Sequence, residues 1–249
     1  MTDKINVNTI VPAGNTLTLG ASGGSVAMTD DVKVNTIKDA GANTLWVSDG
    51  SGNLSSVNSG FGGSLKLLAT SADVGDGVTS ISFTTGITST YNEYIFKFFN
   101  LRDTERDYVS MYFQCSTDGG SNYNTSCTSS VFWSWNYVGM NDPAHQGVAL
   151  YGAGQSNGTA FQEILTNIGS DGVKGTGIGE LHLFTPASTT FVKHWYCRTA
   201  NWRADDRVVE MYAAGYFNTT SAINAIQFNM GGGAYEFQHD SKLKMYGVA

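Results

Sequence analysis

A near-repeat organises the first sixty residues of the chain. Val7–Ile10 (VNTI) returns as Val34–Ile37, and Asn15–Leu17 (NTL) returns as Asn43–Leu45, so the offset is first 27 and then 28 residues. A unit of this length is one supersecondary element that cannot bury a core alone, and two units are fewer than a stable single-chain solenoid needs. The missing burial is therefore expected to come from other copies of the same chain.

The repeats favour a short oligomeric stalk made of β-structure. Short apolar-alternating pieces are separated by glycine-rich turns such as Asp49–Gly52. Three chains wound together would turn their apolar side chains toward a shared axis, so residues 1–54 are predicted to form a homotrimeric stalk. The side chains expected at the axis are Val7, Ile10, Leu17, Leu19, Val34, Ile37, Leu45 and Val47.

The composition changes after the repeats. Residues 55–64 are rich in Gly and Ser, which predicts a flexible junction. From residue 65 to 249, alternating apolar and polar segments recur between turn signals, so we expect an all-β head built as an antiparallel, jelly-roll-like β-sandwich. Residues 159–167 also fit a short helix, but a strand is favoured. The predicted strands are 93–99, 108–115, 130–138, 161–168, 178–184, 191–198, 207–217, 223–230 and 242–248.

Charge and cysteine content exclude several classes of partner. The net charge is −7 and the 14 Lys and Arg residues form no run, which argues against nucleic acid and against an anionic membrane surface. No apolar run reaches the roughly 18 residues of a membrane span, and residues 1–6 lack a signal-peptide apolar core. Cys115, Cys127 and Cys197 form no CxxC motif, so we expect three free thiols packed in β-structure and folding in a reducing cytoplasm.

The chain lacks the short motifs that carry common catalytic chemistry. The sequence contains no HExxH zinc motif, no GxxxxGK[ST] phosphate loop and no GxSxG nucleophile elbow. We therefore expect no enzyme activity, no cofactor and no metal. A glycosidase with two carboxylates stays open at this point, because the separation of two carboxylates in space is not visible in a sequence.

A family resemblance is carried by five segments of the chain, at 7–20, 81–98, 116–123, 215–223 and 242–248. These segments resemble tail-fibre and receptor-binding proteins of tailed bacteriophages, especially marine ones. The resemblance implies a homotrimeric virion structural protein that joins other virion proteins through its stalk and presents a β-sandwich head to a host-surface glycan or receptor. A capsid-surface fibre or decoration protein without receptor recognition is the runner-up, and a glycan-degrading tail enzyme ranks below it. The resemblance also implies that the chain folds in the host cytoplasm before it joins the virion.

Three groups of residues are candidates for glycan binding. An aromatic strand at 131–137 places its alternate side chains on one face, where flat rings could stack on a sugar, or could serve as core or as an interface between chains. A polar loop at 141–146 and an exposed-looking loop at 201–207 could supply hydrogen bonds. The candidate residues are Trp133, Trp135, Tyr137, Asp142, His145, Trp202, Arg203 and Asp205.

Overall fold

The computed structural model of the chain describes residues 36–38, 41–51, 53–57, 64–71, 77–103, 106–140 and 143–248. The chain divides into two compact units, residues 1–61 and 62–249, and each unit is described by itself. Some of the predicted residues lie outside the described part of the chain. These are Val7, Ile10, Leu17, Leu19 and Val34 of the predicted stalk axis, and Asp142 of the predicted glycan site.

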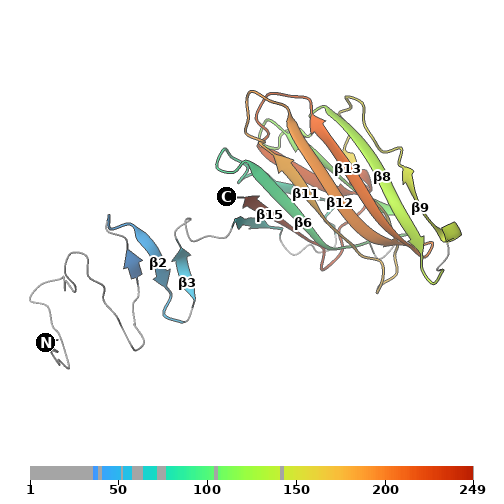
Figure 1. Cartoon of the computed structure of the whole chain (residues 1–249), viewed down its shortest axis with the longest axis horizontal. Coiled ribbons are helices and arrows are strands. Elements are labelled where there is room, and N and C mark those ends of the chain that lie inside the picture. Colours follow the sequence, from blue (N-terminus) through green and yellow to red (C-terminus); the bar gives the residue numbers. More distant parts are fainter. Residues whose placement is uncertain are drawn as a thin grey trace, which may run out of the picture. The chain divides into compact units, whose positions relative to one another are not determined.

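The described part of the first unit is a three-stranded antiparallel sheet. Its strands are β1 (Thr36–Lys38), β2 (Thr44–Ser48) and β3 (Leu54–Val57), paired in that order (Figure 1). Of the predicted axial side chains, Ile37 is exposed, whereas Leu45 and Val47 are half-buried within the single chain. Strand β3 occupies part of the segment whose composition suggested a junction. Whether three copies assemble through this unit stays a prediction.

The second unit is all-β and consists of two antiparallel sheets that pack face to face in a sandwich-like arrangement (Figure 1). The larger sheet has eight strands in the order β4-β15-β6-β11-β12-β13-β8-β9, and the smaller has four in the order β10-β7-β14-β5. The strands are β4 (Leu65–Thr70), β5 (Ser80–Phe83), β6 (Glu93–Leu101), β7 (Val109–Ser116), β8 (Cys127–Tyr137), β9 (Gln146–Leu150), β10 (Gln162–Ile168), β11 (Gly177–Phe184), β12 (Lys193–Arg203), β13 (Arg207–Phe217), β14 (Ala225–Met230) and β15 (Lys242–Val248).

Aromatic rings from both sheets fill the core. Phe113 of the smaller sheet meets Trp195 of the larger sheet edge to face, with 4.9 Å between the ring centroids. Phe228, also of the smaller sheet, lies 5.3 Å from Phe98 and 5.5 Å from Phe96, both of β6. These rings are buried, and each such pair adds about 0.5–1.5 kcal/mol beyond the burial of its area. The aromatic content of the sequence is therefore what holds the two sheets together.

The three cysteines are buried and unbridged, as expected from the sequence. Burial raises the pKa of the Cys127 thiol to about 11 and raises the pKa values of Cys115 and Cys197 as well. Because the thiolate is the reactive form, these side chains behave as small apolar residues of the core.

All nine predicted strands of the second unit are present in its sheets, but three further strands were missed, and several strands extend beyond their predicted bounds. The segment that also fitted a helix forms β10. Strands β4, β5 and β9 were not predicted, because each is short and lies at the edge of a sheet. The prediction of an exposed loop at 201–207 is wrong. Strand β12 continues to Arg203 and β13 begins at Arg207, so only a tight turn of three residues separates them.

The loop between β7 and β8 depends on one carboxylate. Asp118 accepts hydrogen bonds from the Ser116 hydroxyl (2.6 Å), the Asn122 backbone N–H (2.9 Å) and the Asn122 side-chain amide (2.7 Å). The same Asp-to-Asn bonds close the turn between β2 and β3, where Asp49 accepts from the backbone and side chain of Asn53. Both turns share the pattern Asp-Gly-x-x-Asn, so the same local sequence closes a hairpin between β2 and β3 in the first unit and a turn between the two sheets in the second.

We expect acid to weaken the fold through Asp118. Hydrogen bonds from Ser116 and then Asn122 lower the pKa of Asp118 from 3.8 to about 2. A folded-state pKa below the unfolded value contributes stability above about pH 4, and this contribution is lost as the pH falls toward 2. Denaturant titrations across this range should show a smaller acid-dependent loss for Asp118→Asn than for the unmodified chain. Identical pH profiles of the two proteins would contradict this assignment.

Candidate functional site

Five of the predicted residues contact one another or the neighbouring Arg207. We call these six residues the end cluster: Trp133, Trp135, Tyr137, Arg203, Asp205 and Arg207. Trp133 and Trp135 share the core-facing side of β8, with ring centroids 5.5 Å apart and planes tilted by 45°. They fit there because the residues opposite them on β9 are small, Ala149 beside Trp133 and Gly147 beside Trp135. Because the two rings are tilted and half-buried, they do not form one flat platform for a sugar ring.

The charges of the end cluster are paired within the chain. Asp205 lies between two arginines, with its Oδ1 3.3 Å from Arg203 Nε and its Oδ2 3.3 Å from Arg207 Nε. The guanidinium of Arg203 sits 5.1 Å from the Trp133 ring centroid, and that of Arg207 sits 4.4 Å from the Tyr137 centroid. Such cation–π contacts contribute about 0.5–2 kcal/mol each. The cluster is thus a packing unit that ties the β12–β13 turn to β8.

The remaining predicted residues lie around or away from the end cluster. His145 lies at its margin, where its ring meets Tyr137 edge to face at 5.7 Å. Trp202 follows the opposite alternation from Arg203 on β12. Its indole lies against Gly169, where an added Cβ would come within 2.4 Å of the ring, and Lys174 covers it at 5.4 Å. Trp202 is therefore not part of the same surface as Trp133 and Trp135.

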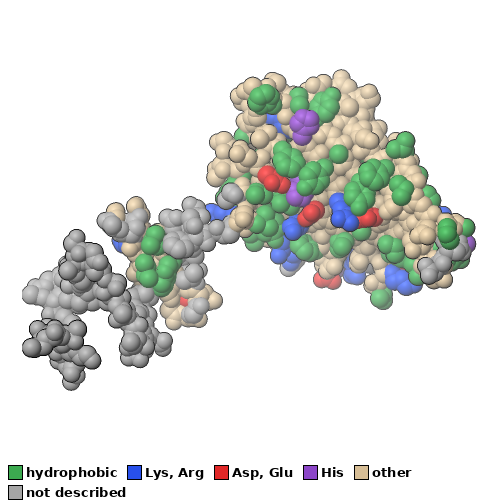
Figure 2. All heavy atoms as spheres, viewed as in Figure 1, with side chains coloured by type: hydrophobic (Ala, Val, Ile, Leu, Met, Phe, Trp, Pro, Cys, Tyr) green, Lys and Arg blue, Asp and Glu red, His purple; other side chains and the backbone are tan. Residues whose placement is uncertain are grey.

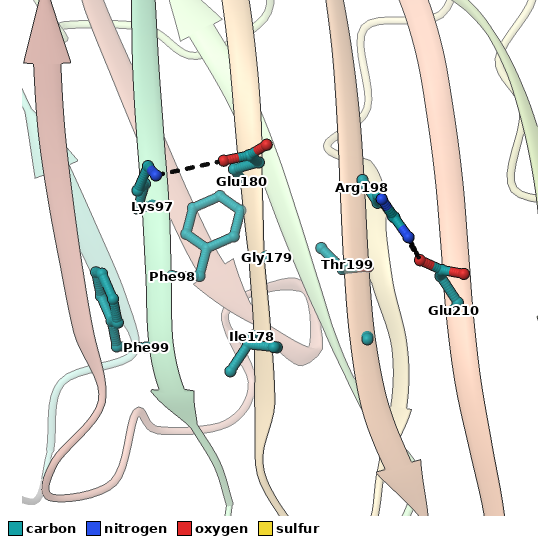
Figure 3. A pocket seen from close by; sticks show the side chains of 10 residues that line it. Lys97, Phe98, Phe99, Ile178, Gly179, Glu180, Arg198, Thr199 and Glu210 are labelled. Atoms are coloured by element: carbon teal, nitrogen blue, oxygen red, sulfur yellow. Dashed lines mark hydrogen bonds and ion pairs between the residues drawn. The ribbon is translucent and has the colours of Figure 1, made fainter. Parts of the chain in front are cut away.

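A groove on the outer face of the larger sheet was missed by the sequence analysis (Figure 3). We call it the outer groove. It has a volume of about 400 Å³, within the range of small-ligand pockets, and four adjacent strands contribute to it. Its main lining residues are Lys97 and Phe99 from β6, Ile178 and Glu180 from β11, Arg198 and Ala200 from β12, and Glu210 from β13.

The apolar part of the outer groove follows from strand register. Ala200 pairs with Ile178 on one side and with Glu210 on the other, so the smallest outward side chain stands between larger ones and leaves a hollow. Phe99 joins it because it follows Lys97 by two residues on β6 and so lies on the same outer face. Beyond Phe99 the strand becomes irregular, with a φ of +49° at Asn100 and a register shift in the pairing with β11. Ile178 and Phe99 remain 55% and 39% exposed, so they present apolar surface to solvent.

Two ion pairs flank this apolar floor, each joining neighbouring strands (Figure 3). Lys97 Nζ lies 3.6 Å from Glu180 Oε2, and the guanidinium of Arg198 binds the carboxylate of Glu210. The bond to Glu210 raises the pKa of Arg198. Figure 2 shows acidic and basic side chains next to apolar ones on this face of the second unit. The outer groove thus combines apolar surface with two acceptor and two donor groups and has no net charge.

A histidine lies next to Glu180 on the same face of β11. His182 is 90% buried at its side chain, with Nδ1 2.6 Å from Glu93 Oε1 and Nε2 3.4 Å from Glu180 Oε1. Its ring stacks on Tyr196 with 4.4 Å between centroids. The Glu180 carboxylate thus lies between Lys97 and the His182 ring, and its hydrogen-bonding capacity toward the outer groove is not used by His182, whose Nε2 makes no hydrogen bond to the described part of the chain.

Comparisons with known proteins add no identification. No protein-family model, curated protein or solved structure matches this chain. Within the described residues, no trio of His, Cys, Asp or Glu side chains is placed to hold a metal ion. The described part of the chain also contains no helix long and apolar enough to cross a membrane.

Proposed function

We propose that the chain is a non-enzymatic virion structural protein of the tail-fibre type, whose jelly-roll-like head binds a host-surface glycan in the outer groove. Its N-terminal stalk forms a homotrimer and joins other virion proteins. The observation that supports binding is the outer groove itself, an apolar floor between two ion pairs on a rigid sheet. The assignment to a virion rests on the sequence resemblance.

The chemistry of the outer groove suits a sugar. A sugar ring offers an apolar C–H face to Ile178 and Ala200 and hydroxyl groups that both donate and accept hydrogen bonds. A shallow groove of this kind holds one ring weakly. Three heads on one stalk would compensate, because linked sites raise avidity without new contacts.

Binding fits the outer groove better than hydrolysis. A glycosidase needs a carboxylic acid that stays protonated in an apolar environment beside a second, ionised carboxylate. Glu180 and Glu210 instead each lie beside a cation. This arrangement favours holding a sugar over cleaving a glycosidic bond.

Blocking the outer groove should abolish glycan binding. Ala200→Trp fills the hollow with an indole, so we expect affinity for host-envelope polysaccharide to fall at least about tenfold, as loss of one good contact set would produce. Ala214→Trp is the matched control, because Ala214 is exposed on β13 and does not line the groove. Surface plasmon resonance on immobilised polysaccharide measures the affinity of each variant and of the unmodified protein. Equal binding by both variants would rule out the groove, and no binding by any form would favour a decoration protein.

The stalk prediction has a separate test. A homotrimer of the 26.6 kDa chain has a mass of about 80 kDa, and light scattering coupled to size-exclusion chromatography measures it. We expect this mass because two repeat units need burial from other chains. A mass equal to one chain would contradict the trimer but would leave glycan binding by the head untouched.

A further inference from the structure

We infer, resting on the proposed function, that the outer groove selects an uncharged sugar ring, and that Glu180 and Arg198 together bind two neighbouring hydroxyls of that ring. The argument depends on the charge balance of the groove, on the register of β11 and β12, and on the exposure of the two side chains.

The charge balance disfavours a charged ligand. Two acids and two bases alternate across the groove, Lys97 and Glu180 on one side and Arg198 and Glu210 on the other. A ligand carboxylate that reached Arg198 would also face Glu180 or Glu210, and a ligand amine would face Lys97 or Arg198. A hydroxyl donates to a carboxylate and accepts from a cation, so an uncharged polyol satisfies all four groups.

The register places an acceptor directly beside a donor. Glu180 and Arg198 are paired across β11 and β12, so their Cβ atoms are about 5 Å apart, while their charged ends turn outward, Glu180 to Lys97 and Arg198 to Glu210 (Figure 3). A carboxylate only accepts hydrogen bonds and a guanidinium only donates them. Two neighbouring hydroxyls on one ring can therefore engage the pair together, one donating to Glu180 and the other accepting from Arg198.

Apolar contact comes from the next pair on the same face. Ile178 and Ala200 are paired two residues along the same strands, a distance of about 7 Å. One sugar ring can thus rest its C–H face on Ile178 and Ala200 while its hydroxyls reach Glu180 and Arg198. Phe99 closes the groove at the β6 side (Figure 3).

Both polar groups remain accessible to a ligand. Glu180 is 42% and Arg198 61% exposed at the side chain, each the more exposed member of its ion pair. An exposed ion pair such as Lys97–Glu180, at 3.6 Å, contributes little to stability. A ligand hydroxyl can therefore join the carboxylate without disrupting the sheet.

The test compares three methyl glycosides on the full-length protein by isothermal titration calorimetry. The probes are a neutral hexoside, a hexuronide and an aminodeoxyhexoside that is charged at neutral pH. We expect the neutral glycoside to bind at least about tenfold more tightly than either charged one, since a buried or opposed charge costs more than a hydroxyl contact provides. Equal or tighter binding of a charged glycoside overturns the inference.

Two substitutions should change the preference in opposite directions. Glu180→Gln keeps the shape and leaves the groove with a net positive charge, so it should weaken the neutral glycoside and improve the hexuronide. Arg198→Gln leaves a net negative charge and should improve the aminodeoxyhexoside. Variants that leave the order of the three glycosides unchanged overturn the assignment of Glu180 and Arg198.

The outcome also separates this inference from the proposed function. Tight binding of a charged glycoside that Ala200→Trp abolishes would refute selection for an uncharged ring while supporting glycan binding in the outer groove. Failure of all three glycosides, and of host polysaccharide, would refute the proposed function and this inference with it. Should either Gln variant fail to fold, the glycoside order of the unmodified protein decides the inference alone.

Discussion

Replacement of Phe228 by alanine should destabilise the head by about 3–5 kcal/mol, the usual cost of deleting a buried phenylalanine ring. Phe228 is fully buried on β14 and contacts rings on both sheets, Phe113 in its own sheet and Phe96 and Phe98 across the core. The cavity would separate groups that join the two layers, and for a domain of this size the melting temperature should fall by about 10 °C. Chemical denaturation and calorimetry measure the two quantities.

The matched control for this substitution is Phe191→Ala. Phe191 is 71% exposed, so removal of its ring should change stability by no more than about 0.5 kcal/mol. A small effect of Phe228→Ala, comparable to that of the control, would mean that the two sheets are not joined by this aromatic core. The head would then need another source of stability.

Much of this architecture could be predicted from local sequence. In β6 the alternation of Tyr94, Phe96 and Phe98 placed three rings on one face, and all three are buried in the core. The bounds of β13 and β15 were also predicted correctly, because both strands end at clear turn or chain-end signals. Alternation with a period of two is a local property, so it survives without knowledge of which strand lies next to which.

Edge strands and turns were harder to predict. Strand β9 has five residues and a Gly at its second position, which weakens the strand signal, and its pairing with β8 decides its state. The loop between β12 and β13 was predicted to begin at Asn201, too early in the sequence, because the segment 201–207 is polar enough to suggest a loop. In the structure, cross-strand pairing with β13 holds Asn201, Trp202 and Arg203 in β12.

The outer groove could not have been predicted from the sequence. Lys97 meets Glu180, which lies 83 positions later, only because β6 pairs with β11 in one particular register. A shift of one residue would move either side chain to the core face. Register across four strands is a property of the folded sheet, so the apolar floor and its flanking ion pairs carry no signal in any local stretch of sequence.

The largest electrostatic effect is expected at Asp205. Its carboxylate lies between Arg203 and Arg207, whose side chains are only 12% and 23% exposed. Asp205→Asn removes the shared negative charge but keeps the shape, so two mostly buried cations lose their counter-ion. Removing one partner of a fully buried pair costs about 3–5 kcal/mol, and the partial exposure here reduces our expectation to about 2 kcal/mol. Urea denaturation at low salt measures the change in the free energy of unfolding.

The neighbouring residue provides the matched control. Asp206 is 64% exposed at its side chain and lies 3.9 Å from Lys174; its φ of +59° is one that asparagine adopts readily. Asp206→Asn should therefore change stability by less than about 0.5 kcal/mol. Equal effects of the two substitutions would show that net charge at the turn matters and that the Arg203–Asp205–Arg207 arrangement does not. A large loss of stability confined to Asp205→Asn would establish that the end cluster holds the β12–β13 turn against β8. If the glycan affinity per folded molecule of this variant is also unchanged, the end cluster takes no part in binding, as the proposed site in the outer groove requires.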